Sequence, residues 1–264
     1  MTIKLIATDM DGTFLNDHGD DDQERFANDY AALQQRGIQF VIASGHQAAE
    51  LATTFSAYPE MWLIGGNGAE LWQREAGLKA ATFSPQATQQ VLAALAPYPE
   101  LQVALCGTQT VHVLAHANPQ FVANMRDYYY QLETCADLTT VTDPVVKFDV
   151  ICPAAMTEQL VYELTPKLAG IAVPASGGQG SMDLIQPGMH KGRALKQLGE
   201  QLGILPDEML VFGDGTNDLE MFHYATHAVA MQNAPENVQA NATAVTGTNV
   251  DNGVLDYIEQ HILS

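Results

Sequence analysis

Two carboxylates separated by one residue, Asp9 and Asp11, are the first side chains of the sequence whose spacing predicts chemistry. They follow directly on an apolar run at residues 5–7, and Gly12 behind them allows the backbone to turn sharply. Such a run is typical of a strand buried on both faces of a parallel sheet, and ligands of these sheets bind beyond the carboxyl ends of the strands. The pair is therefore suited to an oxygen-rich site for a hard cation, with one carboxylate free to act on a substrate.

Three further groups of polar residues come later in the chain at comparable positions. Ser44-Gly45 follows an apolar run at 38–43, Lys191 opens a predicted helix, and Gly213-Asp214-Gly215-Thr216-Asn217-Asp218 follows the apolar run 209–212. We expect these groups and the first two carboxylates to meet at the same end of one parallel sheet.

Carboxylates gathered in this way need a counter-charge. Two of them about 4 Å apart repel each other by roughly 4 kcal/mol at an effective dielectric of about 20, so a cluster of three or four requires a cation or a bound proton. Magnesium meets that need and would also hold the oxygens of a substrate phosphate. Lys191 adds a positive charge, and the Ser44 hydroxyl and the backbone N–H groups of Met10 and Gly45 can bind further phosphate oxygens. The set predicts phosphoryl transfer.

The elements that must position these residues form an α/β pattern. A helix is expected over 23–35, strands over 38–43 and 62–64, and the alternation of strands and helices returns from Lys191. This order predicts a Rossmann-like parallel sheet built from both ends of the chain.

The order of predicted strands and helices changes from Ser84-Pro85 onward. Paired short strands around helices, among them a helix expected over 119–132, predict a separate α+β domain inserted in the first. The expected domains are a core of residues 1–83 and 184–264 and an insertion of residues 84–183.

The composition excludes several classes of partner. The 264 residues include 31 acidic and 11 basic side chains, and the formal net charge of -20 would repel nucleic acid and anionic membrane surfaces. Three cysteines in no metal-binding spacing argue against a disulfide framework or a zinc site. The N-terminus lacks the pattern of an export signal, and no apolar run reaches membrane-spanning length. A cytoplasmic protein is expected.

The four ordered motifs resemble those of the haloacid dehalogenase superfamily. They are Asp-Met-Asp-Gly-Thr, Ser-Gly, Lys and Gly-Asp-Gly-x-Asn-Asp, and the resemblance covers the whole chain. The insertion is similar to the large cap, of the C2 type, in the Cof-type (subclass IIB) sugar-phosphate phosphatases. Met189-His190-Lys191-Gly192 and the turn Gly65-Gly66-Asn67-Gly68-Ala69 match the same branch.

For the first motif, the resemblance implies the chemical step. It implies that Asp9 attacks phosphorus and becomes an aspartyl-phosphate, and that Asp11 protonates the leaving oxygen and then activates water. It also implies that Asp9, the backbone carbonyl of Asp11 and Asp214 hold Mg2+.

The other motifs are implied to hold the phosphate and to support the loops. Ser44, Lys191 and Asn217 would bind phosphate oxygens, and Asp218 would orient Lys191 or a metal-bound water. Thr13 would tie the first loop together, or simply cap its turn.

One position departs from the family pattern in a way that bears on substrate preference. Many relatives carry arginine after the Ser-Gly or Thr-Gly pair, whereas this sequence has His46. The change removes a permanent charge and introduces a group that can titrate near neutrality. We hypothesise that His46 still faces the substrate. Thr216 also replaces a commonly acidic residue.

The sequence as a whole predicts a Mg2+-dependent phosphatase that acts on a small phosphorylated metabolite such as a sugar phosphate. Two alternatives stay open. One is a phosphomutase or phosphotransferase, in which a second hydroxyl replaces water as the acceptor, and the other is a non-catalytic sensor of phosphorylated metabolites. The sequence does not identify the physiological substrate, and it allows a monomer or a small homo-oligomer.

Overall fold

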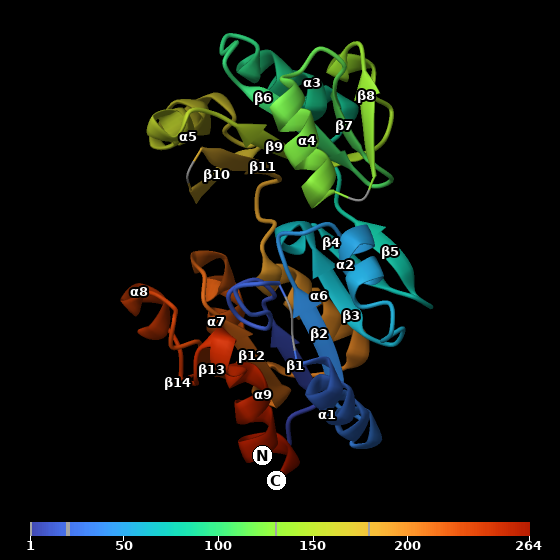
Figure 1. Ribbon diagram of the computed structural model, residues 1–264, viewed down its shortest axis with the longest axis vertical. Helices are drawn as coiled ribbons and strands as arrows, with labels where there is room; N and C mark the ends of the chain where they lie inside the picture. The colour runs from blue at the N-terminus through green and yellow to red at the C-terminus, as the bar shows by residue number, and fades with distance from the viewer. Residues whose placement is uncertain (1, 20–21, 130, 179) are drawn as a thin grey trace. The chain divides into compact units, whose positions relative to one another are not determined.

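The computed structural model describes residues 2–19, 22–129, 131–178 and 180–264. The chain forms two compact units, which we call the core unit (Met1–Lys79 with Met189–Ser264) and the inserted unit (Ala80–Gly188) (Figure 1). The limits expected from the sequence for the insertion, 84 and 183, lie a few residues inside these bounds.

The core unit is built on one sheet with the strand order β14-β13-β12-β1-β2-β3-β4-β5. From β14 to β3 neighbouring strands are parallel, and β4 runs antiparallel to β3. The strands are β1 (Leu5–Thr8), β2 (Gln39–Ala43), β3 (Trp62–Gly65), β4 (Glu70–Gln73), β5 (Gly77–Ala80), β12 (Met209–Gly213), β13 (His227–Ala230) and β14 (Ala244–Val245).

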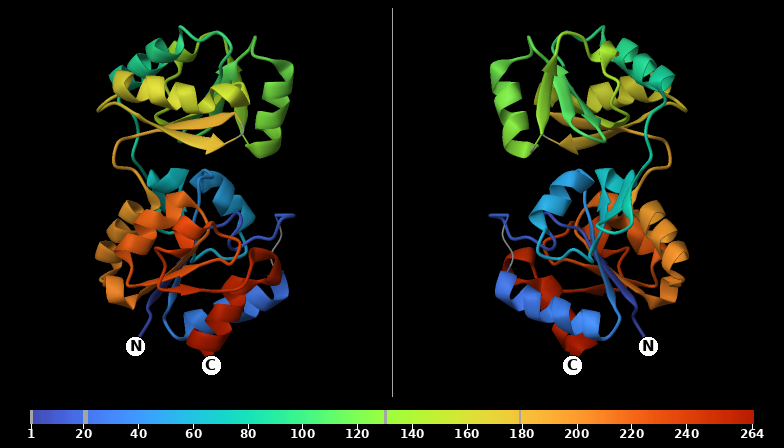
Figure 2. Two further views of the ribbon diagram at one scale, coloured as in Figure 1. Left: turned by 90° about the vertical axis from the view of Figure 1, so that its left-hand side faces the viewer. Right: turned by 90° about the vertical axis from the view of Figure 1, so that its right-hand side faces the viewer.

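Helices cover both faces of this sheet (Figures 1 and 2). The α-helices of the core unit are α1 (Gln23–Gln35), α2 (Ala48–Thr54), α6 (Lys191–Leu202), α7 (Leu219–Tyr224), α8 (Glu236–Gln239) and α9 (Gly253–Ile258), which continues as a π-helical turn, η7 (Glu259–Leu263). Short 3-10 turns are η1 (Gly66–Gly68), η4 (Pro206–Glu208), η5 (Thr216–Asp218) and η6 (Asn249–Asp251). In the described part of the chain, every helix is too short or too polar to cross a lipid bilayer.

Alternation along the central strands decides which helices each face contacts. On β1, Ile6 packs in one buried cluster with α1 and α9, whereas Leu5 and Ala7 pack in another with α6 and α7. The same alternation recurs on β2 and β12, as expected when successive side chains of a strand point to opposite faces. Both faces of the parallel strands are therefore apolar, in agreement with the continuous apolar runs of the sequence.

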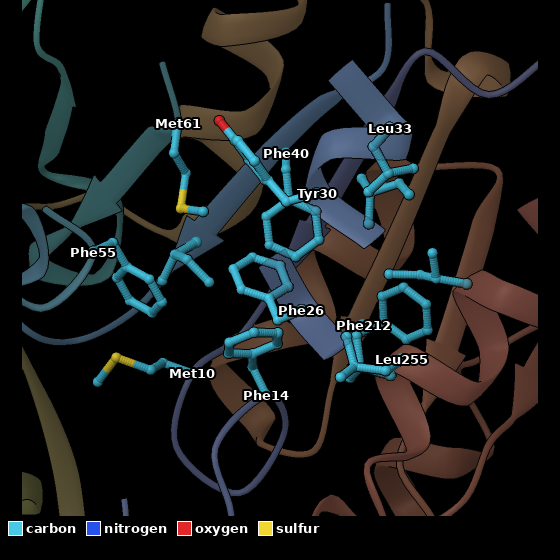
Figure 3. Close-up of a cluster of buried hydrophobic side chains, with 14 of the residues drawn as sticks. Met10, Phe14, Phe26, Tyr30, Leu33, Phe40, Phe55, Met61, Phe212 and Leu255 are labelled. Atoms are coloured by element: carbon cyan, nitrogen blue, oxygen red, sulfur yellow. The ribbon is translucent and has the colours of Figure 1, made fainter. Parts of the chain in front are cut away.

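The loop that carries the two aspartates is anchored in the first of these clusters (Figure 3). Met10 and Phe14 are both buried, and the Phe14 ring lies 4.7 Å from that of Phe26 on α1. The Phe26 ring in turn lies 5.2 Å from that of Phe40 on β2. Burial of Met10 and Phe14 in this cluster thus holds the backbone on both sides of Asp11.

The inserted unit has a sheet of its own with the strand order β10-β11-β9-β6-β7-β8. Its strands are antiparallel to their neighbours except for β7 and β8, which are parallel. Its elements are α3 (Pro85–Leu95), β6 (Gln102–Gly107), β7 (Val111–Leu114), α4 (Pro119–Tyr128), β8 (Leu132–Cys135), η2 (Leu138–Thr140), β9 (Val145–Ile151), η3 (Ala154–Met156), α5 (Thr157–Lys167), β10 (Val173–Gly178) and β11 (Ser181–Ile185).

The prediction of a helix over 119–132 is wrong at the C-terminal end of the helix. It stops at Tyr128, Tyr129 has extended backbone angles, and Leu132–Cys135 forms strand β8. Tyr130 lies outside the described residues. Pairing with β7 supplies hydrogen-bond partners to this segment, and such a long-range effect overrides the local helical pattern. The hairpin of β4 and β5 was likewise not predicted.

Candidate active site

The predicted site residues of the core unit follow the carboxyl ends of neighbouring parallel strands. Asp9 follows β1, Ser44 follows β2 and Asp214 follows β12. The registers align these three strand ends, because Thr8 of β1 is paired with Ile42 on one side and with Phe212 on the other. Lys191 is the first residue of α6. The structure therefore brings the motifs together from both sides of the insertion.

Lys191 is fully buried between two carboxylates. Its Nζ lies 2.5 Å from Asp9 Oδ1 and 2.7 Å from Asp218 Oδ1. Burial opposes the charge of the ammonium, but the carboxylates of Asp218 and Asp9 outweigh it and raise the pKa of Lys191. Lys191 is thus a permanent cation, held by its two partners.

Asp218 supports the loop as well as the lysine. Its Oδ2 accepts hydrogen bonds from the backbone N–H groups of Asp214 (3.1 Å) and Gly215 (2.9 Å). Burial raises the pKa of Asp218 to about 6, although Lys191 acts in the opposite direction. Because both of its oxygens are engaged, Asp218 is placed to orient Lys191 and Asp214.

Asp9, Asp214 and Asp218 form an acidic cluster whose carboxylate oxygens lie within 4.8 Å of one another. Burial raises the pKa of both Asp9 and Asp214. One lysine cannot neutralise three ionised carboxylates, so the cluster needs a further cation or a bound proton. Oxygen-only donors with uncompensated charge fit a hard divalent cation such as Mg2+.

Asp214 is fixed from the side of the first loop. The Thr13 hydroxyl donates a 2.6 Å hydrogen bond to Asp214 Oδ1. Gly12 has a left-handed φ of 76°, and a Cβ atom at this position would lie 2.6 Å from Asp214 Oδ2. Only glycine leaves room here for the second carboxylate oxygen.

The residues expected to bind phosphate line the same edge of the sheet. The buried Ser44 Oγ accepts a 3.1 Å hydrogen bond from the His46 N–H, and Asn217 Nδ2 donates to Asn67 Oδ1 at 3.2 Å. Asn67 also lies against Gly45, where an added Cβ would be 3.4 Å from Asn67 Nδ2. Met10 could contribute only its backbone N–H group, because its side chain is buried in the core.

Asn67 is a further candidate site residue, which from the sequence was expected only to form part of a turn. It has a left-handed φ of 53° within η1, and this conformation brings its amide between Gly45 and Asn217. Asparagine is one of the few residues that adopt it readily. The run Gly65-Gly66-Asn67-Gly68 was the available signal.

Asp11 has a different environment from Asp9. Its side chain is 62% exposed, and its Oδ2 lies 3.1 Å from His46 Nε2. The other ring nitrogen of His46 lies 2.9 Å from Glu50 Oε1, one helical turn further along. Burial lowers the pKa of His46, but the adjacent carboxylates of Asp11 and Glu50 outweigh this and raise it to about 9. The pKa of His46 thus lies above the near-neutral range considered from the sequence, and sequence reasoning did not find Glu50.

Comparisons with known proteins match almost the entire chain. A family model described as haloacid dehalogenase-like hydrolase matches residues 6–258. The chain is 35% identical over 261 residues to 5-amino-6-(5-phospho-D-ribitylamino)uracil phosphatase YbjI of Escherichia coli (strain K12), covering 98% of this chain and 96% of that protein. It is 27% identical over 265 residues to 5-amino-6-(5-phospho-D-ribitylamino)uracil phosphatase YcsE of Bacillus subtilis (strain 168), covering 99% and 96%. The crystal structure of SMU.1108c from Streptococcus mutans UA159 has a TM-score of 0.92 and 30% identity, covering 100% of both chains.

Proposed function

The chain belongs to the haloacid dehalogenase-like hydrolase family and is a phosphatase; from this premise, we propose that it hydrolyses a small phosphorylated metabolite with Mg2+ and an aspartyl-phosphate on Asp9. The predictions of family, α/β fold class and enzyme class are confirmed by the matches. The roles of individual residues, the metal and the substrate are our proposals.

Asp9 and Asp11 carry the proposed chemistry. An Asp9 carboxylate oxygen attacks phosphorus, the bond from phosphorus to the metabolite oxygen breaks, and that oxygen takes a proton from Asp11. Asp11, now a carboxylate, then accepts a proton from water as the water oxygen attacks phosphorus. The second step releases inorganic phosphate and restores Asp9. The contrast between the buried Asp9 and the exposed Asp11 supports this division of roles.

Lys191 is the observation that carries the proposal. A fully buried ammonium contacts Asp9 at the carboxyl end of a central strand, so it can hold the nucleophile and offset phosphate charge in one place. Ser44, Asn217 and the backbone N–H groups of Met10 and Gly45 would bind the remaining phosphate oxygens.

The acidic cluster is the proposed metal site. Asp9, Asp214 and the backbone carbonyl of Asp11 would hold Mg2+, because Asp218 already uses both oxygens within the protein. The ion would supply charge neutralisation for the transferring phosphoryl group. Thr13 and Gly12 would keep Asp214 in place for this task.

The substrate class is inferred from the relatives, together with the inserted unit. Two relatives that match over nearly their whole length are named phosphatases of a phosphoribitylamino-uracil. We therefore favour a phosphomonoester of a sugar or sugar alcohol, with the inserted unit as the part that confers specificity. The cysteines are free thiols, which suits the reducing cytoplasm proposed as its location.

Phosphate release tests the proposal. The protein is assayed on sugar phosphates, ribityl phosphates, nucleotides and p-nitrophenyl phosphate, with Mg2+ or with chelator. Asp9→Asn is compared with Asp207→Asn, a matched change at an exposed residue before the amino end of β12. We expect turnover that requires Mg2+, disappears in Asp9→Asn and persists in Asp207→Asn.

Three outcomes would count against parts of the proposal. Undiminished turnover in Asp9→Asn would exclude Asp9 as the nucleophile, and full turnover in chelator would exclude the metal. Recovery of the phosphoryl group on an added hydroxyl compound instead of as inorganic phosphate would favour a transferase.

A further inference from the structure

Asp11, His46 and Glu50 form a chain of three side chains beside the proposed reaction centre. The His46 ring bridges them, with Nε2 3.1 Å from Asp11 Oδ2 and Nδ1 2.9 Å from Glu50 Oε1. The His46 and Glu50 side chains are each only 14% exposed, whereas that of Asp11 is 62% exposed. Asp11 is therefore the exposed end of this series of contacts, and His46 and Glu50 lie largely within the protein.

The backbone fixes the histidine before its ring makes these contacts. The His46 N–H donates to Ser44 Oγ at 3.1 Å, and the His46 carbonyl accepts from the Gly66 N–H at 2.8 Å. Ser44 directly follows β2 and Gly66 opens the turn η1, and both segments line the candidate site.

Glu50 fixes the ring itself. It lies in α2, four residues after His46, and its buried carboxylate contacts one ring nitrogen. A ring held at one nitrogen presents the other nitrogen in a defined direction, as in other chains in which a carboxylate orients a histidine.

We propose that His46 and Glu50 are positioning residues that hold the Asp11 carboxyl group for proton transfer, an inference that rests on the role proposed above for Asp11. An exposed aspartate has several side-chain rotamers, and only some of them reach the leaving oxygen. A contact to the His46 ring, which Glu50 and two backbone hydrogen bonds of His46 hold in place, selects one orientation. The alternative to this role is the hypothesis that His46 faces the substrate.

If His46 positions Asp11, the effect of its loss on kcat/KM should depend on the leaving group of the substrate. If His46 contacts the substrate directly, the effect should not depend on the leaving group in this way. An aliphatic alcohol leaves poorly as an alkoxide and needs the proton from Asp11, whereas p-nitrophenol leaves as a stable anion and does not. The value of kcat/KM reports the steps up to the first irreversible one, which for these esters is transfer of the phosphoryl group to Asp9. Loss of Asp11 positioning should therefore lower kcat/KM for the aliphatic ester selectively.

The experiment compares His46→Ala and Glu50→Gln with native protein on p-nitrophenyl phosphate and on the best aliphatic phosphate of the panel above. His223→Ala, a change at a histidine on α7 that contacts Asn241, is the control. For the aliphatic ester, we expect kcat/KM of His46→Ala to fall by about ten- to a hundredfold, because the variant loses part of the rate enhancement that a general acid provides. For p-nitrophenyl phosphate, kcat/KM should change little. Glu50→Gln should show the same selectivity with a smaller loss, and His223→Ala should resemble native protein.

Asp11→Asn supplies a second, independent measurement. If His46 acts through Asp11, His46→Ala should lower kcat/KM for the aliphatic ester in the native background and leave it unchanged in the Asp11→Asn background. A direct contact between His46 and the substrate would instead produce similar losses in both backgrounds.

The outcomes separate this proposal from the proposed function. Failure of native protein to hydrolyse any ester would remove the phosphatase proposal itself. Hydrolysis by native protein with equal losses on both esters in His46→Ala, with no loss at all, or with losses that multiply with those of Asp11→Asn would overturn the positioning role.

Discussion

Thr13 and Asp214 are 201 positions apart in the sequence and are joined by a 2.6 Å hydrogen bond from the Thr13 hydroxyl to the Asp214 carboxylate. The bond connects the loop after β1 with the loop after β12, one from each side of the insertion. Oδ2 of Asp214 lies against Gly12, where an added Cβ atom would be only 2.6 Å away. The proposed metal ligand is thus oriented by the same loop that carries Asp9, the proposed nucleophile.

Removing the Thr13 hydroxyl should weaken metal binding. In Thr13→Val, Asp214 loses the partner that orients it, and loss of such a partner typically costs about ten- to a hundredfold in metal affinity. The concentration of Mg2+ at half-maximal turnover should rise accordingly. Thr13→Ser keeps the hydroxyl and should behave like native protein; equal Mg2+ requirements in the valine and serine variants would contradict the role given to this bond.

Replacement of Lys191 should destabilise the core unit strongly. Lys191→Met leaves Asp9 and Asp218 buried without their cation, and breaking a buried ion pair in this way costs about 3–5 kcal/mol in the free energy of unfolding. Lys196→Met, on the same helix, removes an exposed lysine 4.0 Å from Glu200 and should cost less than about 1 kcal/mol. Urea denaturation of both variants measures the difference, and similar values would show that the buried pair is not stabilising.

A side chain at Gly68 should disturb the start of α6. Gly68 has φ +95°, and an added Cβ would lie 2.3 Å from the carbonyl oxygen of His190, the residue before Lys191. Gly68→Ala should lower the melting temperature and the turnover number. Gly203→Ala also places alanine at a left-handed φ but in open space, so it should show only the backbone strain of about 1–2 kcal/mol. Identical effects of the two changes on turnover would argue against a steric role for Gly68.

The carboxylate of Asp29 should make stability depend on pH. Burial raises the pKa of Asp29 to about 6, with the charge of Glu259 adding to the effect, and its Oδ2 has no hydrogen-bond partner among the described residues. Between the unfolded pKa of about 3.9 and the folded pKa the native state binds more protons than the unfolded state, so this group lowers stability as pH rises through that window.

Asp29→Asn should therefore stabilise the protein at pH 7 and lose this advantage near pH 4. We expect a gain of roughly 1 kcal/mol, because water and salt screen part of the effect. Glu24→Gln removes one negative charge from an exposed position on the same helix and serves as the control. Thermal unfolding at several pH values measures both variants, and a gain in Asp29→Asn that does not vary with pH would refute this assignment.

Local signals predicted much of the fold. Helix α1 begins after Asp22, whose carboxylate accepts from the Arg25 N–H, and ends before Gly37, so the bounds 23–35 expected from the sequence are confirmed. Strand β8 could not be found in this way, because it pairs with β7 and helix α4 separates the two strands in the sequence. The same limit applies to the site. The aspartates stand in a recognisable pattern, but the contacts of Asn67 with Asn217 and of His46 with Asp11 depend on how distant loops meet.

The position of the insertion has a consequence for the order in which the chain folds. Strand β1 lies at the centre of the core sheet, and one of its two neighbours is β12. Leu5 can therefore pair with Met209 only after the whole insertion has been synthesised. All strands of the inserted sheet, in contrast, lie within 102–185. We expect a nascent chain to form its inserted unit first, while the central strand of the core still has an open edge that other chains can pair with. Assembly of the proposed active site is then a late event, because Asp9 precedes the insertion in the chain, whereas Lys191, Asp214 and Asp218 follow it.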